Sequence, residues 1–547
     1  MTRIVAEIDE LELPKSQPAG ADSQLPDEQT PPAAAAWKGY QRFSFRIAFI
    51  FFILMSAPTS ASWYTDLAAI DWTSLHYRDI YDLARFSSGF SYVGNTLFGS
   101  TLNGYANWII TLFVAIGGAI VWSLLDRRRQ EYNTLYYWIL AIVRYRAGIG
   151  IIGFGFTKLF PVQMPYPSIG LLNTDFGDLT AQKIYWLSIG IVPWYQVFAG
   201  VVECVAGAML FFRGTAAIGA ALLIGALGSI TYVNFAYDGG VHGYASYFVL
   251  LGSFVLAYYI PRLYNLLILE KFTVPVNHYP SFSKPWERYT RIALKTGTIG
   301  IFIVLLFYLQ WVNFAYDPYK QPSSKGVKQL RGYYNVAEFR VNNTPIPYSP
   351  QDSVRWQEVT FERWTSLSYK VNKAVLLDLS NGGGAPMRDI NRTFELTGVA
   401  GGRRVFYYEV DTVNQTLYLQ DKNTASLRRD TEGGGSRQAN AGESGRRGKE
   451  KVKLDTTWIS PEAKVRLGDE DLRIADIARS HRRTRGIISE KAREVNRPHM
   501  ILHYDTEDGK HVVLRGVNEK NDSIYVVLNR VDRAYSLSRS TLDAGKY

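Results

Sequence analysis

The chain of 547 residues has a single cysteine, Cys204. One cysteine excludes an intramolecular disulfide, a CxxC dithiol and a cysteine-based zinc site, so any redox chemistry has to borrow its electron carrier. The C-terminal part also lacks the HExxH and GxSxG motifs and a phosphate-binding glycine loop. The sequence therefore offers no metal motif and no familiar hydrolase motif from which to read an activity.

Charged residues are few for a water-soluble chain. They make up 20% of the sequence against 47% hydrophobic residues, and the mean hydropathy is −0.08. This value indicates a mixed chain, with a membrane block and a sizeable water-exposed part. The net charge of +11 is explained by basic cytoplasmic loops of a membrane protein, and we expect no nucleic-acid partner.

Seven apolar stretches are long enough to cross a lipid bilayer. They follow a polar stretch, residues 1–42, which we expect to be a disordered cytoplasmic tail. The first stretch ends in a sequence that resembles a signal-peptidase site, but its long charged extension favours a retained helix. The expected spans, within a helical domain of residues 43–315, are Phe43–Trp63, Ala106–Leu125, Thr134–Leu159, Trp186–Phe212, Thr215–Tyr237, Tyr244–Ile260 and Thr296–Phe314.

The charges of the connecting segments alternate along the chain. LLDRRRQEYN, residues 124–133, is basic, whereas the loops on the opposite side are richer in aspartate. The positive-inside rule then places the N-terminus in the cytoplasm and the C-terminus outside a bacterial inner membrane, which requires an odd number of spans. The motif VNFAYD occurs at Val233–Asp238 and again at Val312–Asp317. We expect an interfacial anchor at each copy, with ligand binding by Asn234 and Asn313 as the alternative.

Residues 316–547 have a different pattern. Short aromatic and β-branched runs alternate with Asn, Gly, Asp and Pro, which predicts an all-β sandwich or small closed barrel, lipocalin-like, outside the cytoplasm. Residues 422–497 are expected to be a flexible insertion. Its arginine-rich end, residues 470–497, is compatible with a helix that contacts an anionic headgroup or glycan, or with a solvated charged face.

Four ionisable residues lie within or at the ends of the apolar stretches, where an unpaired charge costs several kcal/mol. Arg144 and Glu203 each lie ten residues from the cytoplasmic end of a span, or ~15 Å at ~1.5 Å per residue, which predicts an ion pair between them. Arg146 should face elsewhere, about 200° around the helix. Lys158 should be a cation near an outer vestibule.

Two interpretations of this charged core remain open. In one, the ion pair only fixes the register of two helices. In the other, the core is a polar pocket for a quinone headgroup or an acidic substrate, in which Glu203 accepts a proton and Lys158 or Arg144 anchors the ligand. His242, after the first VNFAYD, is either a proton relay at the outer surface or an exposed loop histidine.

The segments GIGIIGFGFTKLF, residues 148–160, and VVECVAGAMLFFRG, residues 201–214, together with Arg144, resemble the DoxX family of integral membrane proteins. The likeness covers residues 134–260. It implies that Arg144, Lys158, Glu203 and Gly207 hold the recurring positions of the family, with Arg146 as an alternative arginine. Some members of the family are linked to quinone oxidoreductases, so the resemblance implies quinone as a cofactor.

Two functions from different classes follow. The first is the membrane subunit of a quinone-linked oxidoreductase, with a protein subunit docked on the outer β domain. The second is a non-catalytic envelope assembly or binding protein whose β domain binds a lipid, glycan or protein. A transporter is less well supported, because matched halves with broken helices are not evident.

Overall fold

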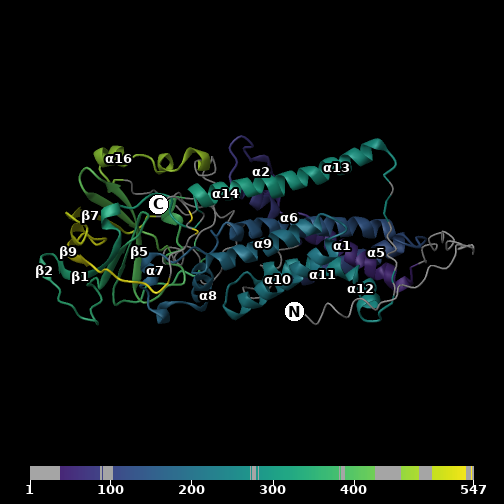
Figure 1. Ribbon diagram of the computed structural model, residues 1–547, viewed down its shortest axis with the longest axis horizontal. Helices are drawn as coiled ribbons and strands as arrows, with labels where there is room; N and C mark the ends of the chain where they lie inside the picture. The colour runs from purple at the N-terminus through teal and green to yellow at the C-terminus, as the bar shows by residue number, and fades with distance from the viewer. Residues whose placement is uncertain are drawn as a thin grey trace, which may run out of the picture.

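The computed structural model describes residues 37–537, except 87–88, 90–102, 272, 274–278, 281, 319, 381, 383–387, 425–456 and 480–495, together with Leu542 and Ala544. These residues form an elongated molecule with a helical bundle at one end and a β-barrel at the other (Figure 1). Residues 1–36 of the expected tail lie outside the described part. The tail ends earlier than predicted, because Trp37 is packed and the first helix begins at Gly39.

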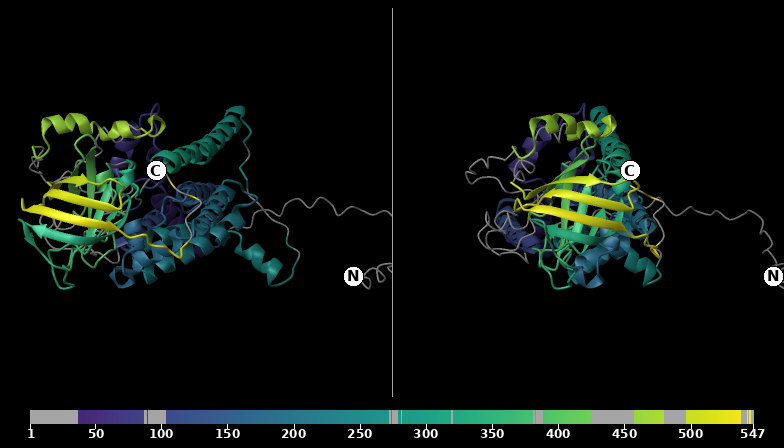
Figure 2. Two further views of the ribbon diagram at one scale, coloured as in Figure 1. Left: turned by 60° about the vertical axis from the view of Figure 1, so that its left-hand side comes forward. Right: turned by 90° about the vertical axis from the view of Figure 1, so that its left-hand side faces the viewer.

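The bundle is built from long helices that run along the molecular axis (Figures 1 and 2). They are α1 (Gly39–Ser56), α5 (Asn103–Leu125), α6 (Asn133–Leu159), α9 (Pro193–Leu210), α10 (Ala216–Ala236), α11 (His242–Ala257), α13 (Pro285–Ile299) and α14 (Leu306–Tyr316). Shorter helices connect them: α2 (Ala61–Ala68), α3 (Tyr77–Ala84), α7 (Ile169–Leu172), α8 (Ala181–Gly190) and α12 (Ile260–Leu267).

Five helices of the described part are long and apolar enough to cross a membrane: Tyr105–Leu125, Asn133–Leu159, Pro193–Leu210, Ala216–Ala236 and Pro285–Tyr316. A sixth is obtained if α11 and α12, which meet at a 65° bend, count as one span. The expected span Trp186–Phe212 is broken, because Pro193 starts a new helix after α8.

Helix α1 occupies the place of the first expected span. Its start lies beside the α5–α6 connection, where the amide of Trp37 donates to the carbonyl of Gln130 (3.2 Å). Arg46 interrupts its apolar sequence, but this side chain is buried and donates to the Tyr132 hydroxyl (2.9 Å) and to Ser123 (2.6 Å). These bonds let α1 pack into the bundle despite its charge. A count of seven spans remains a prediction.

The C-terminal region contains a closed, antiparallel barrel of eight strands. Each strand pairs with the next along the chain, and β1 pairs with β9 to close the ring. The strands are β1 (Gly332–Val341), β3 (Glu358–Phe361), β4 (Ser366–Lys370), β5 (Arg403–Asp411), β6 (Thr416–Asp421), β7 (His499–Asp505), β8 (His511–Val517) and β9 (Ser523–Arg530). The short β2 (Thr344–Pro345) extends only from β1.

Side chains fill the barrel, as expected for eight strands. Alternate residues of β6, β7 and β8 are buried, including Leu417, Leu502 and Leu514. In contrast, β4 is buried on both of its faces. The loop after α6 covers the outer side of β4, so β4 belongs to the part of the barrel that contacts the helical bundle.

The expected flexible insertion, residues 422–497, is partly wrong. Residues 425–456 and 480–495 lie outside the described part, but residues between them form α16 (Pro461–Leu467) and two short 3-10 helices. This segment is held by Arg466, which pairs with Asp411 (2.6 Å), and by Glu470, which accepts from the amide of Asp389 (2.7 Å). The ordered segment lies along one side of the barrel (Figure 2).

Candidate functional site

The charged core of the bundle is an ion pair between Lys158 and Glu203. Lys158 is in the last turn of α6, and Glu203 is in the middle of α9. The Lys158 ammonium donates to Oε1 of Glu203, and both side chains are buried. The other carboxylate oxygen, Oε2, is buried and makes no hydrogen bond with the described residues.

The predicted pair between Arg144 and Glu203 is wrong. Close backbone approaches place Gly148 opposite Gly207 and Gly155 opposite Gly200. In this register Glu203 lies level with Ile152, which is eight residues from Arg144, or ~12 Å along the helix. The depth argument failed because α9 ends at Leu210, well short of the level at which α6 begins.

Side-chain direction explains why Lys158 is the partner. Side chains on a helix lean toward its N-terminus. Lys158 therefore leans back along α6, and Glu203 on the antiparallel α9 leans the opposite way, so the two charges converge. Gly155 and Gly200 let the helices approach closely: a Cβ on Gly200 would lie 2.3 Å from the backbone nitrogen of Leu159. Small residues commonly allow such close packing of helices.

Arg144 and Arg146 lie outside the Lys158–Glu203 pair and on different faces of α6. Arg146 donates to the carbonyl of Ala84 (2.8 Å), and its guanidinium stacks on Phe86 at 4.0 Å. It therefore holds the chain segment that follows α3. Arg144 hydrogen-bonds with Tyr259 and lies close to the charge of Arg213, toward the end of the bundle remote from the barrel.

Asn234 and His242 make local contacts. Asn234 donates to the carbonyl of Ile230 within its own helix (2.7 Å). His242, the first residue of α11, stacks on Phe235 at 4.1 Å and approaches the Tyr105 hydroxyl at 3.4 Å. The described contacts of these two residues do not include Lys158 or Glu203, so the structure does not bring the predicted site residues together.

The two copies of VNFAYD have different environments. Asp238 is exposed in a turn with a φ of 53°. Asp317 is buried and pairs with Arg392 of the barrel region (2.6 Å). The second copy is therefore not a simple interfacial anchor as expected, because the barrel region covers the end of α14. Asn313, in the second copy, is also buried and contacts Gln310 (3.3 Å).

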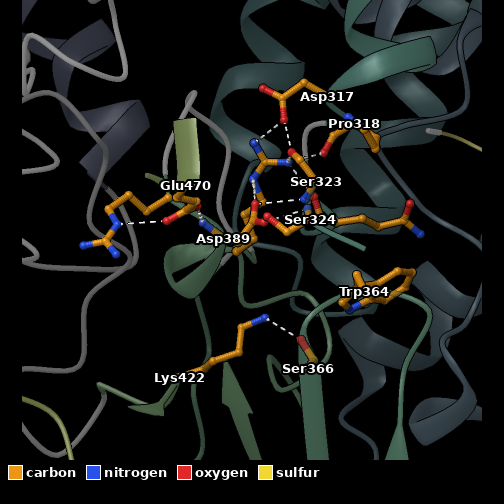
Figure 3. Close-up of polar contacts among 12 residues, drawn as sticks. Asp317, Pro318, Ser323, Ser324, Trp364, Ser366, Asp389, Lys422 and Glu470 are labelled. Carbon is orange, nitrogen blue, oxygen red and sulfur yellow. Dashed lines mark hydrogen bonds and ion pairs between the residues drawn. The ribbon is translucent and has the colours of Figure 1, made fainter. Parts of the chain in front are cut away.

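Arg392 is the centre of a polar network between the bundle and the barrel. Figure 3 labels its partners Asp317, Pro318 and Ser323. Its guanidinium also donates to the carbonyl of Pro318 (2.8 Å) and to the Ser323 hydroxyl (2.9 Å). Asp389 accepts from the amides of Ser323 and Ser324, both at 2.9 Å. Five donors in a rigid fork suit this crowded site, where a lysine could not replace them.

A second polar cluster lies where the loop after α6 covers the barrel. Glu362, next to β3, accepts from the amides of Ile169 (2.9 Å) and Gly170 (2.7 Å) at the start of α7. Burial, together with the nearby Glu395, raises the pKa of Glu362 to about 7, although the two amides favour the ionised form. Glu395 itself pairs with Lys422 (2.5 Å).

Lys183 of α8 belongs to the same buried region. Its ammonium donates to the carbonyl of Phe394 and lies 3.9 Å from the centre of that ring. Burial lowers the pKa of Lys183 to about 7, and Glu395 opposes this effect only in part. Two groups that titrate near neutral pH therefore lie in one interface, and both are close enough to Glu395 to interact with its charge.

A small cavity next to Glu362 measures about 10 Å³, which is room for one water molecule. Its lining includes Glu395, Ser366, Ser368 and Arg403. This volume can hold a proton-bridging water but not an organic cofactor. In the described ranges, no cluster of three histidine, cysteine or acidic residues is arranged to bind a metal ion.

Sequence reasoning missed Glu362, Lys183 and Arg392. Glu362 stands in VTFERW, where a carboxylate follows an apolar strand, and Lys183 is the only cation of α8. A single charged residue beside or within an apolar element was the signal that could have identified these two positions.

Comparisons of the chain with protein-family models, with curated proteins and with solved structures found no match.

Proposed function

We propose that this protein is a bacterial inner-membrane protein that holds a β-barrel firmly on the outer face of the membrane as a binding platform for another envelope protein. The observation that carries the proposal is the polar seat of the barrel. Glu362, Asp317 and Arg392 are buried between bundle and barrel. Such contacts fix the orientation of the barrel, which a flexible tether would not need.

The interior of the barrel is filled with side chains, which favours a partner bound to the outer surface. The order of its strands is that of an up-and-down barrel, a class of barrel that includes binding proteins. However, Tyr334, Phe361 and Tyr408 are among the side chains that fill the interior. Outside, the most exposed large apolar residues of this region are Val465 and Val413, at 83% and 77%. The ion pair between Arg466 and Asp411 holds the two segments together, so we assign the partner to this surface.

The partner surface can be tested by photo-crosslinking in cells. We expect a crosslinking amino acid at Val413 or Val465 of the full chain to capture one discrete protein. The same amino acid at Lys510, an exposed residue of the β7–β8 turn, serves as the control. Absence of a specific adduct at both valines, or the same adducts at Lys510, would contradict the platform.

The orientation can be tested with the single native cysteine replaced by serine. Arg128→Cys lies in the basic connection between α5 and α6, and Glu507→Cys lies in a barrel turn. We expect a membrane-impermeant maleimide to label Glu507→Cys in intact spheroplasts, and Arg128→Cys only after permeabilisation. The reverse pattern would place the barrel in the cytoplasm and end the proposal.

A quinone-linked oxidoreductase subunit is the second candidate, based on the DoxX resemblance. The observation that favours it is Oε2 of Glu203, a buried oxygen with no hydrogen-bond partner in the described part, beside the charge of Lys158. Quinone and quinol interconvert by two electrons, exchanged here with a partner redox subunit, and two protons; this carboxylate would accept a proton from the quinol as the quinol is oxidised, and would return it in the reverse reaction. Glu203→Gln should then abolish reduction of an added quinone analogue, with Asp238→Asn as the control. Reduction that is unchanged in Glu203→Gln would exclude this candidate.

A further inference from the structure

Four cationic side chains converge at the end of the bundle that is remote from the barrel. Arg144 is on α6, Arg213 follows α9, and Arg291 and Lys295 are on α13. They are close enough to interact: Arg144 repels Arg213, and Lys295 is repelled by the other three. Four like charges from three separate segments are unfavourable together unless something negative lies between them.

Aromatic rings hold these cations in place. The guanidinium of Arg213 lies 4.0 Å from the centre of the Tyr279 ring, and the ammonium of Lys295 lies 4.0 Å from that of Phe212. Arg291 lies 5.0 Å from the ring of Phe282. Cation–π contacts of this kind orient a charge without neutralising it. The rings therefore fix the positions of the cations, but their positive charge is not neutralised.

The protein itself supplies no such anion. In the part of the chain that the structure describes, Arg144, Arg213, Arg291 and Lys295 form no ion pair with a carboxylate. Arg144 is 92% buried, and its Nε has no hydrogen-bond partner among the described residues. The hydroxyl of Tyr259, bonded to Arg144, adds a polar group that could donate to an oxyanion. A buried guanidinium without a carboxylate suits a phosphate, which accepts several donors at once.

The surroundings of the cations are apolar and exposed. Helix α13 has no buried residue and leans away from the bundle toward this end (Figures 1 and 2). Phe212, Ile292 and Leu294 are exposed here. An acyl chain could cover these side chains while its headgroup reaches the cations. A freely dissolved anion would leave this apolar surface uncovered.

We propose that Arg144, Arg213, Arg291 and Lys295 bind the phosphate of an anionic phospholipid, whose acyl chains lie against α13 and the end of α9. Basic loop residues usually interact with the membrane surface as solvated charges. This cluster differs because it contains a buried arginine and because rings fix the other three cations. The site does not depend on the Lys158–Glu203 pair or on the barrel platform.

The test uses the full chain in nanodiscs of phosphatidylglycerol or phosphatidylcholine, followed by native mass spectrometry after release into mild detergent. We expect retention of one phosphatidylglycerol and little phosphatidylcholine. The double variant Arg213→Gln/Lys295→Gln should retain phosphatidylglycerol roughly thirtyfold more weakly, at roughly fivefold per cation. Lys284→Gln, which removes an exposed cation at the start of the same helix, should behave like the wild type.

Folding and ligand source are controlled separately. The double variant changes two side chains outside the helical core, and an unchanged size-exclusion profile confirms that it folds. Equal retention of the two lipids would overturn the proposal, as would equal loss of lipid in Lys284→Gln and in the double variant. Displacement of the bound lipid by millimolar inorganic phosphate would assign the cations to a soluble anion and also overturn the lipid site.

Discussion

Lys158 and Glu203, 45 residues apart in the chain, form a buried ion pair that joins α6 to α9. The pair lies beside the closest approach of the two helices, at Gly155 and Gly200. Little of either side chain is exposed: 10% of Lys158 and 1% of Glu203. A shift of α6 against α9 would therefore separate the two charges and leave each one buried without its partner.

Removing one member of this pair should be worse than removing both. Glu203→Leu leaves the Lys158 ammonium buried alone, and we expect a loss of about 3–5 kcal/mol in unfolding free energy. The double variant Lys158→Met/Glu203→Leu replaces both charges with apolar groups and should recover most of the loss. Apparent melting temperatures in one detergent would show the difference. If the double variant melts below Glu203→Leu, the pair is not held by mutual neutralisation.

The glycine contact gives a prediction with a matched control. Gly200→Ala places a methyl group 2.3 Å from the nitrogen of Leu159, and backbone cannot move aside cheaply. We expect a loss of about 3 kcal/mol from overpacking. Gly225→Ala on α10 meets no atom within 4 Å and should leave the melting temperature unchanged or raise it. Similar melting temperatures for the two variants would show that the crossing tolerates a wider spacing.

Stability should depend on pH through Glu362 and Lys183 in opposite ways. Burial raises the pKa of Glu362 from 4.5 to about 7, so the folded protein holds an extra proton between these values and loses stability as pH rises through them. Burial lowers the pKa of Lys183 from 10.5 to about 7. The folded protein then binds fewer protons in that window, so stability rises with pH above about 7.

Each limb of this pH profile can be removed separately. Glu362→Gln should flatten the melting temperature between about pH 5 and 7, and Lys183→Met should flatten it above about pH 7. Glu507→Gln, at an exposed position, should leave both limbs intact. A wild-type profile without a minimum near neutral pH would contradict the opposing shifts, provided that the protein unfolds reversibly.

The repeated VNFAYD motif supplies a test of the barrel seat. Asp317→Asn removes the partner of the buried Arg392 guanidinium, and we expect a loss of about 3–5 kcal/mol together with faster proteolysis between α14 and β1. Asp238→Asn is the same change in the first copy, where the side chain is exposed. Asparagine also tolerates the positive φ there, so this control should be close to neutral. Equal protease sensitivity of the two variants would show that Arg392 does not secure the barrel.

Local patterns in the sequence predicted much of the architecture. Apolar runs located the helices α5, α6, α10 and α11 to within a few residues, and aromatic runs predicted a sandwich or a small closed barrel, of which the structure has the barrel. Both patterns arise from the burial of residues within one helix or strand, and this burial is visible in the order of apolar and polar residues along the chain. Pro193 was overlooked, although proline commonly starts a helix and here separates α8 from α9.

Relations between elements were harder to predict. The partner of Glu203 depends on the register of α6 against α9. The glycine contacts set this register, and it cannot be derived from the helix lengths alone. The buried seat of the barrel depends on contacts such as Glu362 with Gly170, 192 residues apart. The polar residues of VTFERW resembled an ordinary exposed strand end, because their burial comes from another domain.

Glu362 accepts its hydrogen bonds from a loop that is synthesised long before the barrel. This loop and Lys183 on α8 therefore remain without their barrel partners until β3 to β5 have been synthesised. The barrel then completes its fold against a surface that only a correctly inserted bundle provides. Assembly is thus ordered: the barrel can complete its buried base only after the bundle helices have packed.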